Sequence, residues 1–197
     1  MRTAILARHG ETTYNLRLAL NGDLAVSVPL TPKGEEQARR LGKQLARERI
    51  DLCVTSEFER AQRTAALALT GRSLPRLVMP ELNDPLYGSF EGALLDDYRA
   101  WAASAPSSAV PPGDGESRLA IVERYSRAFR RVAERPEETV LVVSHSLPVA
   151  YVLAACDGEP PGPRVPLVET AHPYWLDEAE LERAVELLER WVAEPTW

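Results

Sequence analysis

Two short, largely apolar runs, residues 1–7 and 139–143, each end two residues before a histidine. The run at 139–143 is almost continuously apolar, which is typical of a central parallel strand that is buried on both faces of a sheet. The residues that follow the two runs are Arg8-His9-Gly10 and Ser144-His145-Ser146. Ligands of open α/β sheets bind at the carboxyl ends of the strands. We therefore expect both histidines at one edge of a sheet.

The rest of the chain alternates between strand and helix patterns. Further strands are predicted at 51–55 and 74–79, and helices at 60–69, 93–104, 116–134, 147–156 and about 177–193. Another helix begins at Pro32, with Thr31 as its N-cap. This alternation predicts an α/β protein, a three-layer α/β/α sandwich with a mostly parallel central sheet. We interpret 1–197 as one domain with a lid or insert at about 85–115.

The composition excludes several classes of protein. The formal net charge of −6 argues against a general nucleic-acid binder, although a cleft can still attract an anionic substrate. No apolar run approaches the ~20 residues that span a bilayer, and the start has no signal-peptide pattern, so we expect a cytoplasmic protein without a membrane partner. Cys53 and Cys156 are predicted to be free thiols, and no cysteine–histidine spacing indicates zinc.

The segment Arg8-His9-Gly10 has the chemistry of a phosphate site. Arg8 offers a planar guanidinium that suits a phosphate, and a neutral His9 offers a nucleophilic nitrogen. Gly10 lets the backbone pass close to a ligand. Arg60 is predicted at a helix N-terminus just after a strand, where free N–H groups and the helix dipole also favour phosphate.

Four segments together resemble the histidine phosphatase (phosphoglycerate mutase-like) superfamily, in its compact phosphatase branch. They are Arg8-His9-Gly10-Glu11-Thr12-Thr13-Tyr14-Asn15, residues 55–65, residues 81–92 and Ser144-His145-Ser146. The resemblance implies that His9 attacks phosphorus, that His145 contacts the phosphoryl group and that Asp84 donates a proton to the leaving group. It also implies that Arg8, Asn15, Arg60 and Ser146 bind phosphate, and that no metal or cofactor is needed. The expected partner is a small phosphorylated substrate.

Two positions depart from the family pattern. Asp84 stands where the family has a glutamate, and its side chain is one methylene shorter. Glu81 and Glu91 are therefore rival proton donors in the same loop. Ser146 replaces the usual glycine, so its side chain could narrow the site while its backbone N–H still points inward.

The loop at 16–30 favours a phosphatase over a mutase. It is rich in aliphatic residues, whereas a mutase that handles a small doubly anionic acid needs extra cations at the pocket wall. Residues 111–117 also resemble a segment of the compact phosphatases. The alternatives are phosphoglycerate mutase-type phosphoryl transfer and a non-catalytic module that binds phosphate or a phosphoprotein. The sequence leaves the physiological substrate and the oligomeric state open.

Overall fold

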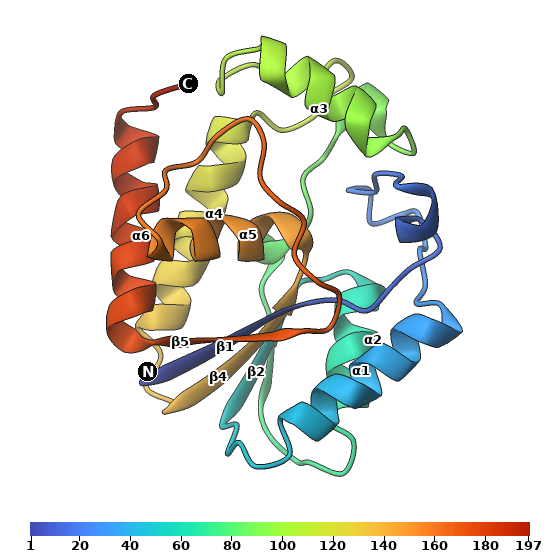
Figure 1. Cartoon of the computed structure of the whole chain (residues 1–197), viewed down its shortest axis with the longest axis vertical. Helices are drawn as coiled ribbons and strands as arrows, with labels where there is room; N and C mark the ends of the chain where they lie inside the picture. Colours follow the sequence, from blue (N-terminus) through green and yellow to red (C-terminus); the bar gives the residue numbers. More distant parts are fainter.

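A computed structural model describes residues 1–197 and contains a five-stranded sheet (Figure 1). The strands are β1 (Thr3–Arg8), β2 (Leu52–Thr55), β3 (Arg76–Val78), β4 (Thr139–Ser144) and β5 (Pro173–Asp177). Their order is β3-β2-β4-β1-β5, and all are parallel except β5, which runs antiparallel to β1. The prediction of a mostly parallel sheet is confirmed.

The register aligns the carboxyl ends of the three middle strands. Val143 of β4 lies opposite Ala7 of β1 on one side and opposite Thr55 of β2 on the other. Residues 140–144 are fully buried, as the apolar run predicted. Segments that are more than forty residues apart in the chain therefore leave the sheet side by side.

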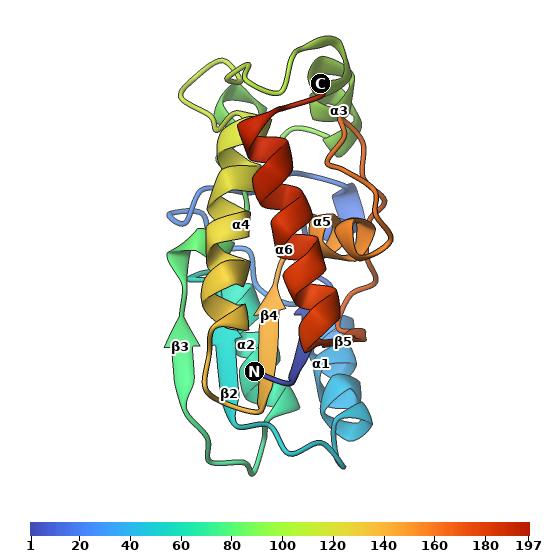
Figure 2. The ribbon, with the colours of Figure 1, turned by 90° about the vertical axis from the view of Figure 1, so that its left-hand side faces the viewer.

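Helices cover both faces of the sheet. On one face lie α1 (Pro32–Gln44) and α2 (Glu59–Ala68), and on the other lie α4 (Arg118–Ala133), α5 (Ser146–Cys156) and α6 (Glu178–Ala193) (Figure 1). Figure 2 shows α4 and α6 side by side in front of the sheet. Within β1, Ala4 and Leu6 pack toward α4 and α6, while Ile5 and Ala7 pack toward α1 and α2. The predicted three-layer sandwich is confirmed.

Local capping fixes where these helices begin. The Thr31 side chain accepts a hydrogen bond from the Gly34 N–H at 3.0 Å, and Pro32 is the first residue of α1, as predicted. At α6, Asp177 and Glu180 form a reciprocal capping box, in which each side chain accepts from the other residue's backbone N–H.

The sixth α-helix, α3 (Leu95–Ser104), lies apart from the sheet. This helix packs through a small cluster of Leu20, Tyr87, Tyr98 and Ala102. Short 3-10 helices at η1 (Asn15–Arg17), η2 (Pro80–Leu82) and η3 (Gly88–Phe90) shape the neighbouring loops. In Figure 1, α3 lies above the other helices, on the side toward which the strands carry their carboxyl ends.

The sequence analysis missed β5. Its residues include Pro173, which lacks a backbone N–H, and Trp175, which is 47% exposed. A proline at the first position of an edge strand is tolerated, but it weakens the sequence signal for a strand. Both cysteines are free thiols, as predicted. No helix is long and apolar enough to cross a bilayer.

Candidate functional site

Three adjacent strands deliver polar side chains to one edge of the sheet. His9 follows β1, His145 follows β4 and Ser56 follows β2. All three residues are buried, and the two imidazole rings lie 5.3 Å apart between centroids, in an edge-on arrangement. The sequence prediction that the two histidines meet at one edge is confirmed.

His9 is held in one tautomer by its neighbour. Its Nδ1 lies 2.8 Å from the Gly10 carbonyl oxygen, which can only accept a hydrogen bond, so Nδ1 carries the proton. The lone pair is therefore on Nε2. Burial, reinforced by Arg60, His145 and Arg8, lowers the pKa of His9 well below its usual value. His9 is consequently a neutral imidazole at pH 7, as a nucleophile requires.

The backbone at Gly10 is fixed by two further contacts. Its N–H donates to Thr64 Oγ1 at 2.9 Å, and the Thr64 hydroxyl in turn donates to the Arg60 carbonyl at 2.7 Å. A Cβ at Gly10 would lie only 2.4 Å from the Gly34 carbonyl oxygen. Glycine is therefore required here by the close approach of α1.

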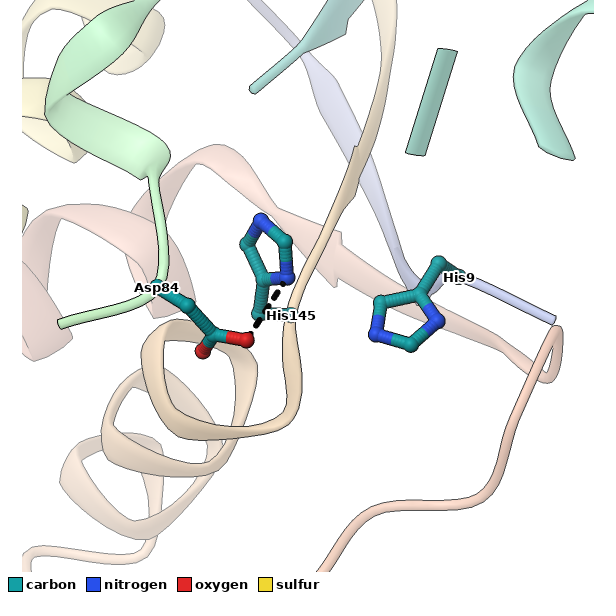
Figure 3. Close-up of side chains that lie close together, drawn as sticks. All are labelled: His9, Asp84 and His145. Carbon is teal, nitrogen blue, oxygen red and sulfur yellow. Dashed lines mark ion pairs between the residues drawn. The ribbon is translucent and has the colours of Figure 1, made fainter. Parts of the chain in front are cut away.

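His145 lies between Ser56 and Asp84. Its Nε2 is 2.8 Å from the Ser56 hydroxyl, and its Nδ1 is 3.0 Å from Asp84 Oδ2 (Figure 3). Burial lowers the pKa of His145; Asp84 opposes this shift, and Arg60 reinforces it. Figure 3 shows Asp84 and His9 on opposite sides of His145.

Asp84 and Arg60 form a largely buried ion pair. Arg60 Nη2 lies 2.9 Å from Asp84 Oδ2, and the same guanidinium donates to the side chain and the backbone of Asn21. Burial would raise the pKa of Asp84, but His145 and Arg60 outweigh it and hold this pKa below the usual aspartate value. Asp84 is therefore ionised at neutral pH when no ligand is bound.

The rival acids have structural contacts elsewhere. Glu81 pairs with Arg131 on the surface. The Glu91 carboxylate accepts from the backbone N–H groups of Gly22 and Tyr87 at 2.9 Å each, which ties two loops together. Of the three acidic residues, Asp84 alone lies with the histidines.

The remaining predicted phosphate ligands line the same cavity. Arg8 donates to the Val168 carbonyl at 3.0 Å, and its buried Nε has no hydrogen-bond partner. Asn15 Oδ1 accepts from the Thr12 N–H at 2.9 Å, which leaves its amide donors free. The Ser146 hydroxyl accepts from the Val168 N–H at 3.2 Å, so its side chain is tied to the loop before β5.

The cavity itself has a volume of about 180 Å³ and combines a cationic end with apolar walls. Its polar lining includes Arg8, His9, Asn15, Arg60, Asp84 and Ser146. Its apolar lining comes from two loops, from α3 and from α5, and includes Leu18, Ala19, Leu20, Val28, Leu95, Leu147, Val165 and Leu167. The site can thus bind a phosphate at one end and an apolar group beside it.

Three potential metal ligands, on His9, Asp84 and His145, lie within 4.8 Å of one another. However, Asp84 Oδ2 already accepts a hydrogen bond from Arg60, and Arg8 lines the same cavity. Two guanidinium charges beside a single carboxylate favour an anion over a divalent cation in this space.

The sequence analysis did not identify every residue of the site. Asn21, Thr64 and Arg118 were missed, although the first anchors Arg60, the second anchors Gly10 and the third lines the cavity. The sequence position of Arg118 could have indicated a functional role. The helix dipole disfavours a cation in the first turn of a helix, so an arginine there is unexpected on structural grounds alone.

Comparison with known proteins finds one family and several relatives. The family model described as histidine phosphatase superfamily (branch 1) matches residues 4–190. An adenosylcobalamin/alpha-ribazole phosphatase from Escherichia coli strain K12 is 35% identical over 164 residues, which cover 79% of each chain. A 2,3-bisphosphoglycerate-dependent phosphoglycerate mutase from a Methylobacterium species is also 35% identical, over 80% of this chain and 81% of its own.

A solved structure repeats the fold. The alpha-ribazole phosphatase from Shigella flexneri superposes with a TM-score of 0.75 at 31% sequence identity, over 89% of this chain and 90% of that one.

Proposed function

Because the chain belongs to the histidine phosphatase superfamily, we propose that it hydrolyses a phosphomonoester through a phosphohistidine on His9. The family and the named phosphatase relatives support phosphatase activity. The observation that carries the mechanism is the contact between His9 Nδ1 and the Gly10 carbonyl, since it leaves the Nε2 lone pair available in a cationic cavity.

In the first step, His9 Nε2 attacks phosphorus and the bond from phosphorus to the leaving oxygen breaks. Arg8, Arg60 and His145 stabilise the charge on the phosphoryl oxygens, which is the main requirement of phosphoryl transfer. Asp84 donates a proton to the departing alkoxide. Asn15 and Ser146 add hydrogen bonds to the phosphate.

Asp84 must hold a proton at that moment, although it is ionised in the unliganded site. We infer that the substrate supplies it: a phosphomonoester has a second pKa of about 6 and reaches the site partly as a monoanion. The bound phosphoryl group also takes over the hydrogen bonds of Arg60 and brings negative charge beside Asp84, and both effects raise the pKa of that carboxyl.

In the second step, water attacks the phosphohistidine. Asp84 accepts a proton from that water, the phosphorus–nitrogen bond breaks, and inorganic phosphate leaves with His9 restored. No metal or other cofactor takes part in this scheme.

The leaving group that suits this cavity is bulky and partly apolar. The aliphatic residues of the loop at 16–30 and of α3 line the space beside the cationic end. Alpha-ribazole phosphate, from the names of the relatives, is therefore one natural ester to include in a substrate panel.

The first test is phosphate release from p-nitrophenyl phosphate in the presence of EDTA. The wild-type protein should turn over, and His9→Ala should abolish turnover. The wild-type protein would also be quenched during turnover of a phosphate-labelled ester. Label that stays on the protein, and is lost in acid but kept in base, would identify the phosphohistidine. Turnover that survives His9→Ala would overturn the proposal.

Mutase chemistry is a second candidate, favoured by the mutase relative at 35% identity. Product analysis with 3-phosphoglycerate and its bisphosphate primer separates the two, since isomerisation faster than phosphate release would identify a mutase. Tight phosphate binding with no turnover on any ester would instead identify a non-catalytic binding module.

A further inference from the structure

Four arginines line the cavity, and they differ in their counter-ions. Arg60 contacts Asp84 at 2.9 Å, and Arg99 lies 3.7 Å from Asp96. Arg8 and Arg118 make no ion pair with any carboxylate. Arg8 belongs to the proposed phosphate site, so its uncompensated charge has a use there. Arg118 shares this property but has no part in the mechanism.

Arg118 is held rigidly by two tyrosines. Its Nε donates to the Tyr98 hydroxyl at 3.0 Å and its Nη1 donates to the Tyr151 hydroxyl at 2.9 Å. Both tyrosines are 1% exposed, and Arg118 itself is 6% exposed. Its remaining nitrogen, Nη2, makes no hydrogen bond within the protein. The side chain therefore presents a fixed, unused donor in the cavity that it lines.

Burial and the helix dipole both act against a cation at this position. Arg118 is the first residue of α4, where the helix dipole places partial positive charge. A buried charge without an opposite charge is costly, and neutral hydroxyls offset only part of that cost. An anion bound beside Nη2 would supply the missing charge, as a carboxylate does for Arg60.

Arg118 is also placed to act on the same ligand as His9. The first turn of α4 lies toward α3 in Figure 1, and Tyr98 comes from α3. Tyr87 lies near enough to both Asp84 and Arg118 that each affects its pKa, which burial raises most strongly. The residues of the proposed phosphate site and a second cationic group, Arg118, therefore line one cavity.

We propose that Arg118 is a specificity-determining residue that binds a second anionic group, a carboxylate, on the leaving group of the substrate. This inference depends on the proposed function for the assignment of the first anion, the phosphoryl group, to the His9 end. It narrows the substrate class to phosphomonoesters that carry both an apolar portion and a carboxylate.

The test uses binding of phosphonates, which cannot be hydrolysed. Isothermal titration would compare benzylphosphonate with its meta and para carboxylated forms, on the wild-type protein and on Arg118→Met. We expect at least one carboxylate to strengthen binding to the wild type by about tenfold or more, and Arg118→Met to remove that gain. Benzylphosphonate itself should bind both proteins within about threefold.

Arg99→Met is the matched control, since it removes another cavity-lining charge that already has a carboxylate partner. Arg99→Met should still prefer the carboxylated phosphonate. If Arg99→Met lost this preference and Arg118→Met kept it, the assignment to Arg118 would be overturned. Equal binding of all three phosphonates to the wild type would also refute the inference while leaving the proposed function intact.

Failure of every phosphonate to bind would refute the phosphate site, and the inference with it. Arg118→Lys, which keeps the charge, should keep part of the gain and guards against a folding defect.

Discussion

Arg60 and Asp84 form a largely buried ion pair in which Nη2 and Oδ2 are 2.9 Å apart. The proposed mechanism assigns phosphate binding to Arg60 and proton donation to Asp84. The pair keeps Asp84 ionised in the unliganded site, and Asn21 orients the Arg60 guanidinium. Gly22 allows this arrangement, because its backbone touches the loop that carries Asp84: a Cβ there would lie 1.6 Å from the Pro85 carbonyl oxygen.

The role of Asp84 can be tested by varying the leaving group. Asp84→Asn should lower kcat for an alkyl phosphate by about 10²–10⁴-fold, because an alkoxide needs a proton to leave. With p-nitrophenyl phosphate the loss should be much smaller, since p-nitrophenolate leaves without one. Asp84→Glu, which restores the longer side chain of the family pattern, should retain activity on both esters. Equal losses on the two esters in Asp84→Asn would assign the residue a structural role.

The dependence of kcat/KM on pH should have an acidic optimum. Because the pKa of His9 is lowered well below 6.5, its protonation reduces the rate only at pH values well under that figure. Above about pH 6 the substrate monoanion that carries the proton for Asp84 becomes scarce, so the rate should fall again. A pH series with an alkyl phosphate measures both limbs. A profile that is flat from about pH 5 to about pH 8 would contradict the proposal that the substrate monoanion supplies the proton to Asp84.

Thr64 should support both stability and catalysis. Thr64→Val keeps the shape of the side chain but leaves the Gly10 N–H buried without an acceptor, which should cost about 1–3 kcal/mol of unfolding free energy. It should also lower kcat, because the Gly10 carbonyl orients His9. Urea unfolding and steady-state kinetics check the two effects. Thr64→Ser retains the hydroxyl and is the control; a Thr64→Val protein of wild-type stability would disprove the assigned contact.

Acid should destabilise the fold through its two buried histidines. Both His9 and His145 have pKa values below the 6.5 expected in the unfolded chain. Above about pH 6.5 the two histidines are neutral in both states, and the free energy of unfolding does not depend on their protonation. As the pH falls further, the unfolded chain takes up a proton at each histidine before the folded protein does. The free energy of unfolding then decreases by about 1.4 kcal/mol per histidine for each pH unit. Urea midpoints at about pH 7 and about pH 5.5 measure the loss.

His9→Gln should show a smaller difference between those two midpoints, since one of the two protons is no longer taken up. His172, whose side chain is 43% exposed and lies outside the site, offers the control, and His172→Gln should keep the wild-type difference. If His9→Gln showed the same difference between the two urea midpoints as the wild type, His9 would be excluded as a source of the acid destabilisation.

Three of the four motif segments begin at the last residue of a strand, and these three predicted the centre of the site. In a parallel sheet the carboxyl ends of neighbouring strands share an edge, so Arg8, His9 and His145 had to meet once β1 and β4 paired. Asp84 was harder to choose over Glu81 and Glu91 from the sequence. The structure separates them because Glu81 and Glu91 are held by Arg131 and by backbone N–H groups, respectively.

From the sequence alone one could predict the layered α/β fold, the two strands that precede His9 and His145, and the cationic residues of the site. These features follow from local apolar patterns and from the chemistry of single residues. The structure was needed to show that β5 completes the sheet, that Thr64 fixes Gly10, and that Arg118 lines the same cavity without a carboxylate partner. Such contacts join residues from distant segments. The free energy of such a contact depends on its burial and on the geometry of the partner residue. Neither property produces a repeating pattern of residues that could be recognised in the sequence.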